Sequence, residues 1–139
     1  MSGPTDPRQW SEARRWLVRA DEDLRAAEAL SALDPPSLET AAFHCQQAAE
    51  KMAKAVLIAH RQPPPHLHDV EELGRRIRAL HPVVGDAFAA LGGLTRWYVS
   101  GRYPDAGLED VPTAAEVGAV LKSLGELRRQ IESLAPSAP

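Results

Sequence analysis

The chain has 139 residues, of which 44% are hydrophobic and 25% charged, and its formal net charge is −3. This length suits a single domain that buries roughly two-thirds of the surface exposed by its unfolded chain. The 16 Lys and Arg against 19 Asp and Glu exclude a broadly basic surface for nucleic acids, although a local basic patch is compatible with them. The single cysteine, Cys45, excludes an intramolecular disulfide and a zinc site made of cysteines.

The sequence has neither a secretory signal nor an apolar run that approaches the ~18 residues of a membrane span. We therefore expect a cytoplasmic protein with no membrane partner. We expect residues 1–139 to form one helical domain that is ordered from about residue 7 to about residue 134, with both tails disordered.

The first predicted helix begins at Asp6-Pro7-Arg8-Gln9 and extends to about Leu33. Aspartate can cap a helix, proline suits the first helical position, and glutamine completes a capping box. The turn Asp34-Pro35-Pro36-Ser37 then stops the helix. The apolar stripe leaves Trp10 to one side and passes through Ala13, Trp16 or Leu17, Ala20, Leu24, Ala27 and Leu30.

The central helix is predicted around the stretch from Ala41 to His60, with Ser37 as its cap. Small and apolar residues recur at steps of three and four and predict close approach by a second backbone: Ala41, Cys45, Ala48, Met52, Ala55 or Val56, and Ala59. The opposite face is polar and carries Gln46, Gln47, Glu50, Lys51 and Lys54. Because the turn before this helix is short, the first two helices should be antiparallel.

Three further helices are predicted in the second half of the chain. The capping boxes Asp69-Val70-Glu71-Glu72 and Thr113-Ala114-Ala115-Glu116 mark the starts of a short third helix and of the last helix. Between them, apolar spacing predicts a fourth helix from Val84 to Tyr98, in which Gly92-Gly93 should introduce a kink or a weak point. The pattern therefore predicts an all-α fold, an antiparallel up-and-down four-helix bundle plus one short helix.

Several motifs occur in an order that resembles the HEPN family, the higher eukaryotes and prokaryotes nucleotide-binding domain. The central helix carries Gln46-Gln47-Ala48-Ala49-Glu50-Lys51, followed by Lys54-Ala55. The remaining landmarks are Trp16, Asp23-Leu24, His68-Asp69 and Arg102-Tyr103-Pro104. The resemblance extends from about Trp10 to Leu134, and it implies a HEPN-type bundle of the small stand-alone prokaryotic kind.

The resemblance also implies a function and partners. It implies a non-catalytic module, without a cofactor, that binds a nucleotide, RNA or another polyanion and interacts with proteins. Such domains often occur beside a separately encoded minimal nucleotidyltransferase in a toxin–antitoxin-like pair, and we expect that partner here. We also expect a homodimer, with Trp10, Trp16 and Trp97 as candidate anchors, because aromatic side chains left outside a core are typical of interfaces.

A metal-independent ribonuclease toxin is the main alternative, because several HEPN proteins cleave RNA with a motif of Arg and His separated by four to six residues. Arg102 does not begin such a motif, since no histidine follows His81. Formal matches occur at Arg61 with His66 or His68, and at Arg76 with His81. We therefore assign no catalytic residue. A purely structural dimeric adaptor is the third interpretation.

The candidate ligand-binding residues fall into three groups. His68 and Asp69 form a pair in which the carboxylate would orient or charge the imidazole, unless Asp69 only caps the helix. Arg102 and Tyr103 offer a guanidinium for phosphate and a ring for stacking, or else bond helix carbonyls and cover the core.

The third group, Glu50, Lys51 and Lys54, belongs either to a nucleotide pocket or to a buried polar network. We predict no metal site, because no third ligand accompanies His66 and His68. Cys45 lies on the apolar stripe, which favours a buried structural thiol.

Overall fold

The computed structural model describes residues 6–94, 97 and 111–136. Among these residues it contains no strand, but five α-helices and one 3₁₀ turn: α1 (Pro7–Ser31), α2 (Leu38–Ala59), α3 (Val70–Arg78), α4 (Pro82–Ala89), η1 (Gly92–Leu94) and α6 (Ala114–Glu132). The predicted all-α fold is confirmed. No helix in the described part of the chain combines the length and hydrophobicity that crossing a membrane requires.

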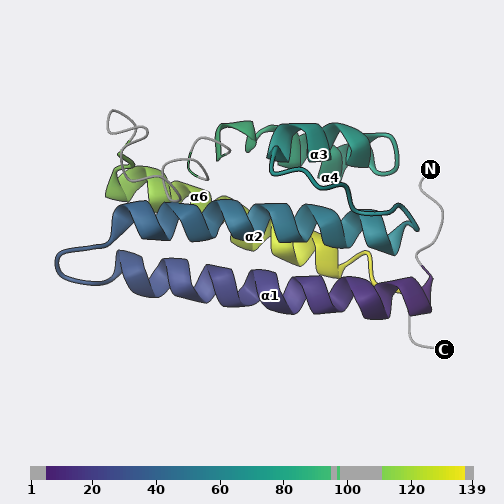
Figure 1. Ribbon diagram of the computed structural model, residues 1–139, viewed down its shortest axis with the longest axis horizontal. Coiled ribbons are helices and arrows are strands. Elements are labelled where there is room, and N and C mark those ends of the chain that lie inside the picture. Colours follow the sequence, from purple (N-terminus) through teal and green to yellow (C-terminus); the bar gives the residue numbers. More distant parts are fainter. Residues whose placement is uncertain (1–5, 95–96, 98–110, 137–139) are drawn as a thin grey trace.

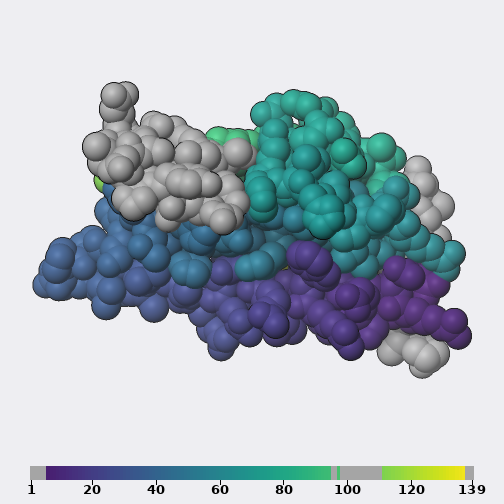
Figure 2. All heavy atoms as spheres, viewed as in Figure 1, coloured from purple at the N-terminus to yellow at the C-terminus, as the bar shows by residue number. Residues whose placement is uncertain are grey.

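The two longest helices, α1 and α2, lie antiparallel and side by side along the whole molecule (Figure 1). Asp6 caps α1 by accepting a hydrogen bond of 2.8 Å from the Arg8 backbone N–H, as predicted. Ser37 occupies the cap position of α2, but its side chain makes no capping hydrogen bond. In the space-filling view this pair forms the lower part of the visible face, and the part of the chain that contains α3 and α4 lies above it (Figure 2).

Helix α2 is the centre of the fold, because other segments surround it. Helix α6 crosses behind the α1–α2 pair, α3 packs on α2 toward the end away from the α1–α2 turn, and α4 packs against α3 and α6 (Figure 1). Every residue from Met52 to Ala59 is buried. A helix that is enclosed all round must also bury its polar face, and Gln46, Glu50 and Lys54 are accordingly buried.

The short helices α3 and α4 form a tight pair. Asp69 caps α3 and accepts hydrogen bonds from the backbone N–H groups of Glu71 and Glu72, at 3.0 and 3.3 Å. Close approach of the two backbones needs glycine, since a Cβ added to Gly85 would lie 2.3 Å from the backbone nitrogen of Arg78.

The fourth helix is shorter than the predicted span from Val84 to Tyr98. It ends at Ala89, and a 3₁₀ turn follows at Gly92–Leu94. The weak point expected at Gly92-Gly93 is therefore a break in the helix, because two consecutive glycines lower helix propensity by roughly 2 kcal/mol in total. Helix α3 is the predicted short third helix, and α4 with the 3₁₀ turn stands where the longer fourth helix was expected.

The prediction that Trp10 lies outside the core is wrong. Its side chain is 6% exposed, and the Arg14 guanidinium lies 5.5 Å from the ring centroid. Trp97 is also buried, at 2% exposure, whereas Trp16 is partly exposed. The apolar stripe of α1 is wider than predicted, so two of the three proposed anchors belong to the core of one chain.

Candidate anion-binding seam between α1 and α2

The main polar feature of the described structure is a line of side chains where α1 meets α2. Trp16 and Asp23 lie seven residues apart, and therefore on one face of α1. His44, Gln47, Lys51 and Lys54 follow one another at steps of three and four, and therefore share one face of α2. Because the helices are antiparallel, the two faces meet, and we call these six residues the polar seam.

Asp23 organises one end of the polar seam. Its side chain is only 11% exposed, and its two oxygens have separate partners. Nδ1 of His44 lies 2.8 Å from one oxygen, and Nζ of Lys51 lies 2.5 Å from the other. A carboxylate only accepts hydrogen bonds, so Nδ1 of His44 carries the donated proton. A buried carboxylate is tolerated in this position because both of its oxygens are paired.

Glu50, whose side chain is 7% exposed, organises a second cluster. Nζ of Lys54 lies 2.7 Å from one carboxylate oxygen, and Nδ1 of His68 lies 3.0 and 3.1 Å from the two oxygens. Nε2 of Gln46 donates to the same carboxylate at 3.3 Å. Three side chains from α2 and the segment before α3 therefore converge on one buried acid.

Two glutamines extend the Glu50 cluster. Nε2 of Gln47 donates to Oε1 of Gln46 at 2.7 Å. Nε2 of Gln46 also donates to the backbone carbonyl of His68 at 3.1 Å, which ties the loop before α3 to α2. The Glu50 cluster therefore includes both glutamines, and the Asp23 cluster lies beside it, because Lys51 follows Glu50 directly on α2.

The two clusters together, which we call the polar network, have an acidic interior and a hydrogen-bond-donating edge. The carboxylates of Asp23 and Glu50 are almost enclosed, whereas the side chains of His44, Lys51 and His68 are 30%, 28% and 50% exposed. Lys54 is an inner member, at 10% exposure, and its Nζ lies 5.9 Å from the centroid of the Trp16 ring. Nitrogen atoms that are oriented from behind by buried acids form an edge suited to anionic oxygens.

The structure brings together three of the residues predicted from the sequence, Glu50, Lys54 and His68, whereas Lys51 is bonded to Asp23. Asp69 has a different place, because it caps α3, while Glu50 is the carboxylate that orients His68. Arg102 and Tyr103 lie outside the described residues.

Sequence analysis did not identify Asp23 and His44 as candidate residues for the site. The signal was present in two spacings, the seven residues from Trp16 to Asp23 and the seven from His44 to Lys51. These spacings become informative only with the knowledge that α1 and α2 pack antiparallel through those faces.

Residues that formally match the ribonuclease motif make other interactions in the structure. Arg61 forms an ion pair with Asp6, and Arg76 lies 3.6 Å from Glu72. Nδ1 of His81 accepts a hydrogen bond of 3.4 Å from the backbone N–H of Val84 and so caps α4.

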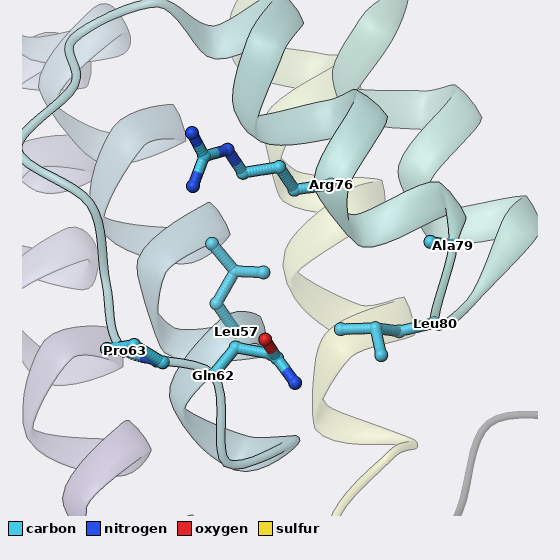
Figure 3. A pocket seen from close by; sticks show the side chains of 6 residues that line it. All are labelled: Leu57, Gln62, Pro63, Arg76, Ala79 and Leu80. Atoms are coloured by element: carbon cyan, nitrogen blue, oxygen red, sulfur yellow. The ribbon is translucent and has the colours of Figure 1, made fainter.

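Two cavities lie near the C-terminal end of α2. The larger, of about 500 Å³, extends the polar seam and is lined by Gln9, Glu12, Trp16, Ile58, Arg61, Gln62, Pro63 and Pro64. The other, of about 390 Å³, lies between α2 and α3, and Figure 3 shows Arg76 reaching from α3 across it above Leu57. Gln62 and Pro63 line both cavities, so this loop separates them.

Metal binding and chemistry at the cysteine thiol have no support among the described residues. They contain no group of three or more His, Cys, Asp or Glu side chains arranged to hold a metal ion. Cys45 is fully buried, and burial raises the pKa of its thiol to about 12. The thiol therefore stays protonated near neutral pH and is a poor nucleophile.

Comparison with known proteins gives one finding. Neither the curated proteins nor the solved structures include a match to this chain. A family model described as HEPN domain matches residues 13–134, a span that contains α2, the polar seam and all the later helices. The chain belongs to the HEPN domain family.

Proposed function

We propose that this HEPN domain is a non-catalytic module that binds a phosphate-bearing ligand, a nucleotide or RNA, along the polar seam. The observation that supports this function is the division of charge within the network. Asp23 and Glu50 are enclosed, while Lys51, His44 and His68 present donors at its edge. An enclosed carboxylate bonded to an exposed donor fixes the direction of that donor. It thereby reduces the entropy lost when a ligand orders the donor on binding.

Lys51 is the residue that best tests the proposal. Its Nζ is held by Asp23, yet 28% of its side chain is exposed, so it combines orientation with access. We expect Lys51→Gln to weaken binding of ATP or of a short single-stranded RNA by about 10- to 100-fold, the effect of losing a hydrogen bond to a charged group. Isothermal titration at low and high salt measures this, and affinity should fall with salt.

Lys122→Gln is the matched control, because it removes the same charge from an exposed position on α6. It should leave the affinity unchanged. Equal weakening by both variants would show that only net charge matters, and no binding of either probe would refute the proposed function. In that last case the structural adaptor is the better interpretation.

RNA cleavage is a second candidate that one observation favours. Nδ1 of His68 is hydrogen-bonded to Glu50, and the side chain is half exposed. In the neutral ring this leaves the lone pair on Nε2, the nitrogen needed to take a proton from a 2′-hydroxyl. That oxygen would attack the adjacent phosphorus to form a 2′,3′-cyclic phosphate, while the bond from phosphorus to the 5′-oxygen breaks and the 5′-oxygen takes a proton from solvent. A labelled RNA incubated with a chelator tests it, and cleavage that His68→Ala abolishes would replace the non-catalytic proposal.

The proposed partners are a minimal nucleotidyltransferase protein, in a toxin–antitoxin-like pair, and a second copy of this chain. Family membership supports both. With Trp10 and Trp97 in the core, Trp16 is the remaining candidate anchor for a dimer. Light scattering tests the dimer, and a mass of about 15 kDa across micromolar concentrations would contradict it.

A further inference from the structure

We propose that the cavity beside Trp16 holds the planar base of a nucleotide whose phosphate groups lie on the polar seam, an inference that rests on the function proposed above. The cavity of about 500 Å³ is within the usual size of small-molecule sites. It shares Trp16 with the polar seam. The same face of α2 continues into it, because Ile58 follows Lys54 by four residues and lines the cavity.

The lining suits a neutral heteroaromatic ring. Trp16 supplies a stacking surface, and Ile58, Pro63 and Pro64 supply apolar walls. The amides of Gln9 and Gln62 offer both donors and acceptors, which is what the edge of a base requires. The Gln9 amide and the indole come from α1 and the Gln62 amide from the loop after α2, so the cavity exists only in the folded domain.

The charges at the cavity oppose the alternative of a phosphate there. Glu12 contributes a carboxylate to the lining. Arg61 contributes a guanidinium, but that group is already paired with Asp6. Glu12 in turn lies 3.7 Å from Arg15, so both charges of the lining have partners and an uncharged ring fits there without competing for them.

The distance between the cavity beside Trp16 and the donors of the polar seam fits one ligand. Trp16 and Asp23 are seven residues apart on α1, a rise of about 10 Å along the helix. Asp23 is hydrogen-bonded to Lys51 and His44. A base stacked on Trp16 would therefore place its attached phosphates, or the next nucleotide of a strand, toward the nitrogen donors of those two residues.

The loop that closes the cavity is held in place. The backbone N–H of Gln62 donates to the carbonyl of Leu57 at 2.8 Å, and that of Arg61 donates to Ile58 at 2.9 Å. Arg61 has φ of 62°, a left-handed conformation that costs a non-glycine residue free energy. Such strain persists only where surrounding contacts impose it, so Gln62 and Pro63 have a defined position before a ligand arrives.

Titrations with ATP, UTP and tripolyphosphate at one ionic strength test the inference. Tripolyphosphate carries the negative charges without a base. We expect at least one nucleotide to bind about 5- to 100-fold more tightly than tripolyphosphate, the usual gain from stacking a base on an aromatic side chain. Trp16→Leu should remove this difference, whereas Lys51→Gln should weaken all three ligands.

The outcomes separate this inference from the proposed function. If both nucleotides bind no more tightly than tripolyphosphate, the base site is refuted and the anion-binding seam remains. If none of the three ligands binds, both proposals are refuted. Should Trp16→Leu fail to fold, Gln62→Ala tests the same cavity from the loop on its other wall, and it should reduce the preference for a nucleotide. Unchanged preference in Gln62→Ala, or in a folded Trp16→Leu, would overturn the inference.

Fluorescence provides an independent readout. Stacking of a base on Trp16 should quench part of the tryptophan emission, and Trp16→Phe should abolish that quenching. Trp10→Phe is the matched control, because Trp10 is buried, is absent from the lining of this cavity and should leave the quenching in place. Quenching that disappears in Trp10→Phe instead would contradict the site.

Discussion

Burial determines how the charged side chains of α2 behave. Lys51 and Lys54 are three residues apart, yet their side chains are 28% and 10% exposed. Lys51 lies at the edge of the network, where a ligand can reach it. Lys54 is enclosed between Glu50 and the Trp16 ring, so its charge mainly compensates a buried acid.

Lys54→Met should therefore destabilise the domain. Removing one partner of an enclosed ion pair leaves the other charge poorly compensated, at a cost on the order of 3 kcal/mol, limited by the remaining contacts of Glu50 with His68 and Gln46. Urea unfolding measures the change in the free energy of unfolding. Lys122→Met is the control and should change it by less than about 0.5 kcal/mol; equal stability of both variants would contradict this role for Lys54.

Cys45 should be unreactive in the folded protein. Burial raises the pKa of its thiol to about 12, and no part of the side chain is exposed. A thiol reagent applied near neutral pH should label the native chain only as fast as it opens, and should label the denatured chain at once. Rapid stoichiometric labelling of the native protein would show that the thiol is accessible.

At the scale of single helices, the ends show which local signals the fold uses. Thr113 and Glu116 form a reciprocal capping box, with hydrogen bonds of 3.0 and 3.1 Å. Asp69 caps α3 from one side only, because Glu72 bonds to Arg75 instead. Ser37 makes no capping hydrogen bond with its side chain.

Two cap variants should consequently differ in effect. Thr113→Ala removes the acceptor for a backbone N–H at the start of α6 and should cost about 1 kcal/mol in the free energy of unfolding. Ser37→Ala should be close to neutral, since no bond is lost. Thermal melting of the two variants measures the difference, and an equal loss in both would contradict the assignment.

Two glycines should respond in opposite directions to alanine. A methyl group at Gly85 would lie within 2.4 Å of two backbone atoms of Arg78, so Gly85→Ala should force α3 and α4 apart and cost about 1–3 kcal/mol. A methyl group at Gly118 in α6 meets nothing within 4 Å, and Gly118→Ala should stabilise by about 0.5–1 kcal/mol. Denaturant melts of the pair measure this, and stabilisation by both would show that the α3–α4 contact is loose.

At the scale of the whole molecule, ion pairs join the two ends of the chain. Glu132 of α6 lies 3.0 Å from Arg14 of α1 and 3.1 Å from Arg128. Arg128 in turn reaches Asp21 of α1 at 2.8 Å. Burial alone would raise the pKa of the Glu132 carboxyl, but hydrogen bonds from Arg128 and Arg14 outweigh it and hold this pKa below its ordinary value.

The sign of this shift predicts a dependence of stability on pH. A depressed pKa in the folded state means that the ionised carboxylate contributes stability above the ordinary pKa of glutamate, and that this is lost as pH falls through the lower folded value. Glu132→Gln should therefore be less stable than the wild type near neutral pH, by no more than about 1 kcal/mol because the pair is half exposed. The two proteins should converge in acid, and a difference that grows on acidification would contradict the ion pairs.

The sequence by itself determined the elements of this protein. Proline, aspartate and threonine at helix starts, and steps of three and four between apolar residues, depend on interactions a few residues apart, so the helices α1, α2, α3 and α6 could be located without coordinates. The family resemblance relied on the same local order of motifs, and the family model confirms it.

Only the tertiary structure decided which side chains meet. Glu50 and His68 are 18 residues apart, and Asp23 and His44 are 21 apart, so their pairing depends on how helices and loops pack. Helix periodicity likewise indicated one apolar face on α1, but the width of the buried face, which includes Trp10, follows from how many neighbours surround it. Hydrogen bonds within a helix are local and leave a pattern in the sequence, whereas a network shared by several segments arises only when packing brings them together.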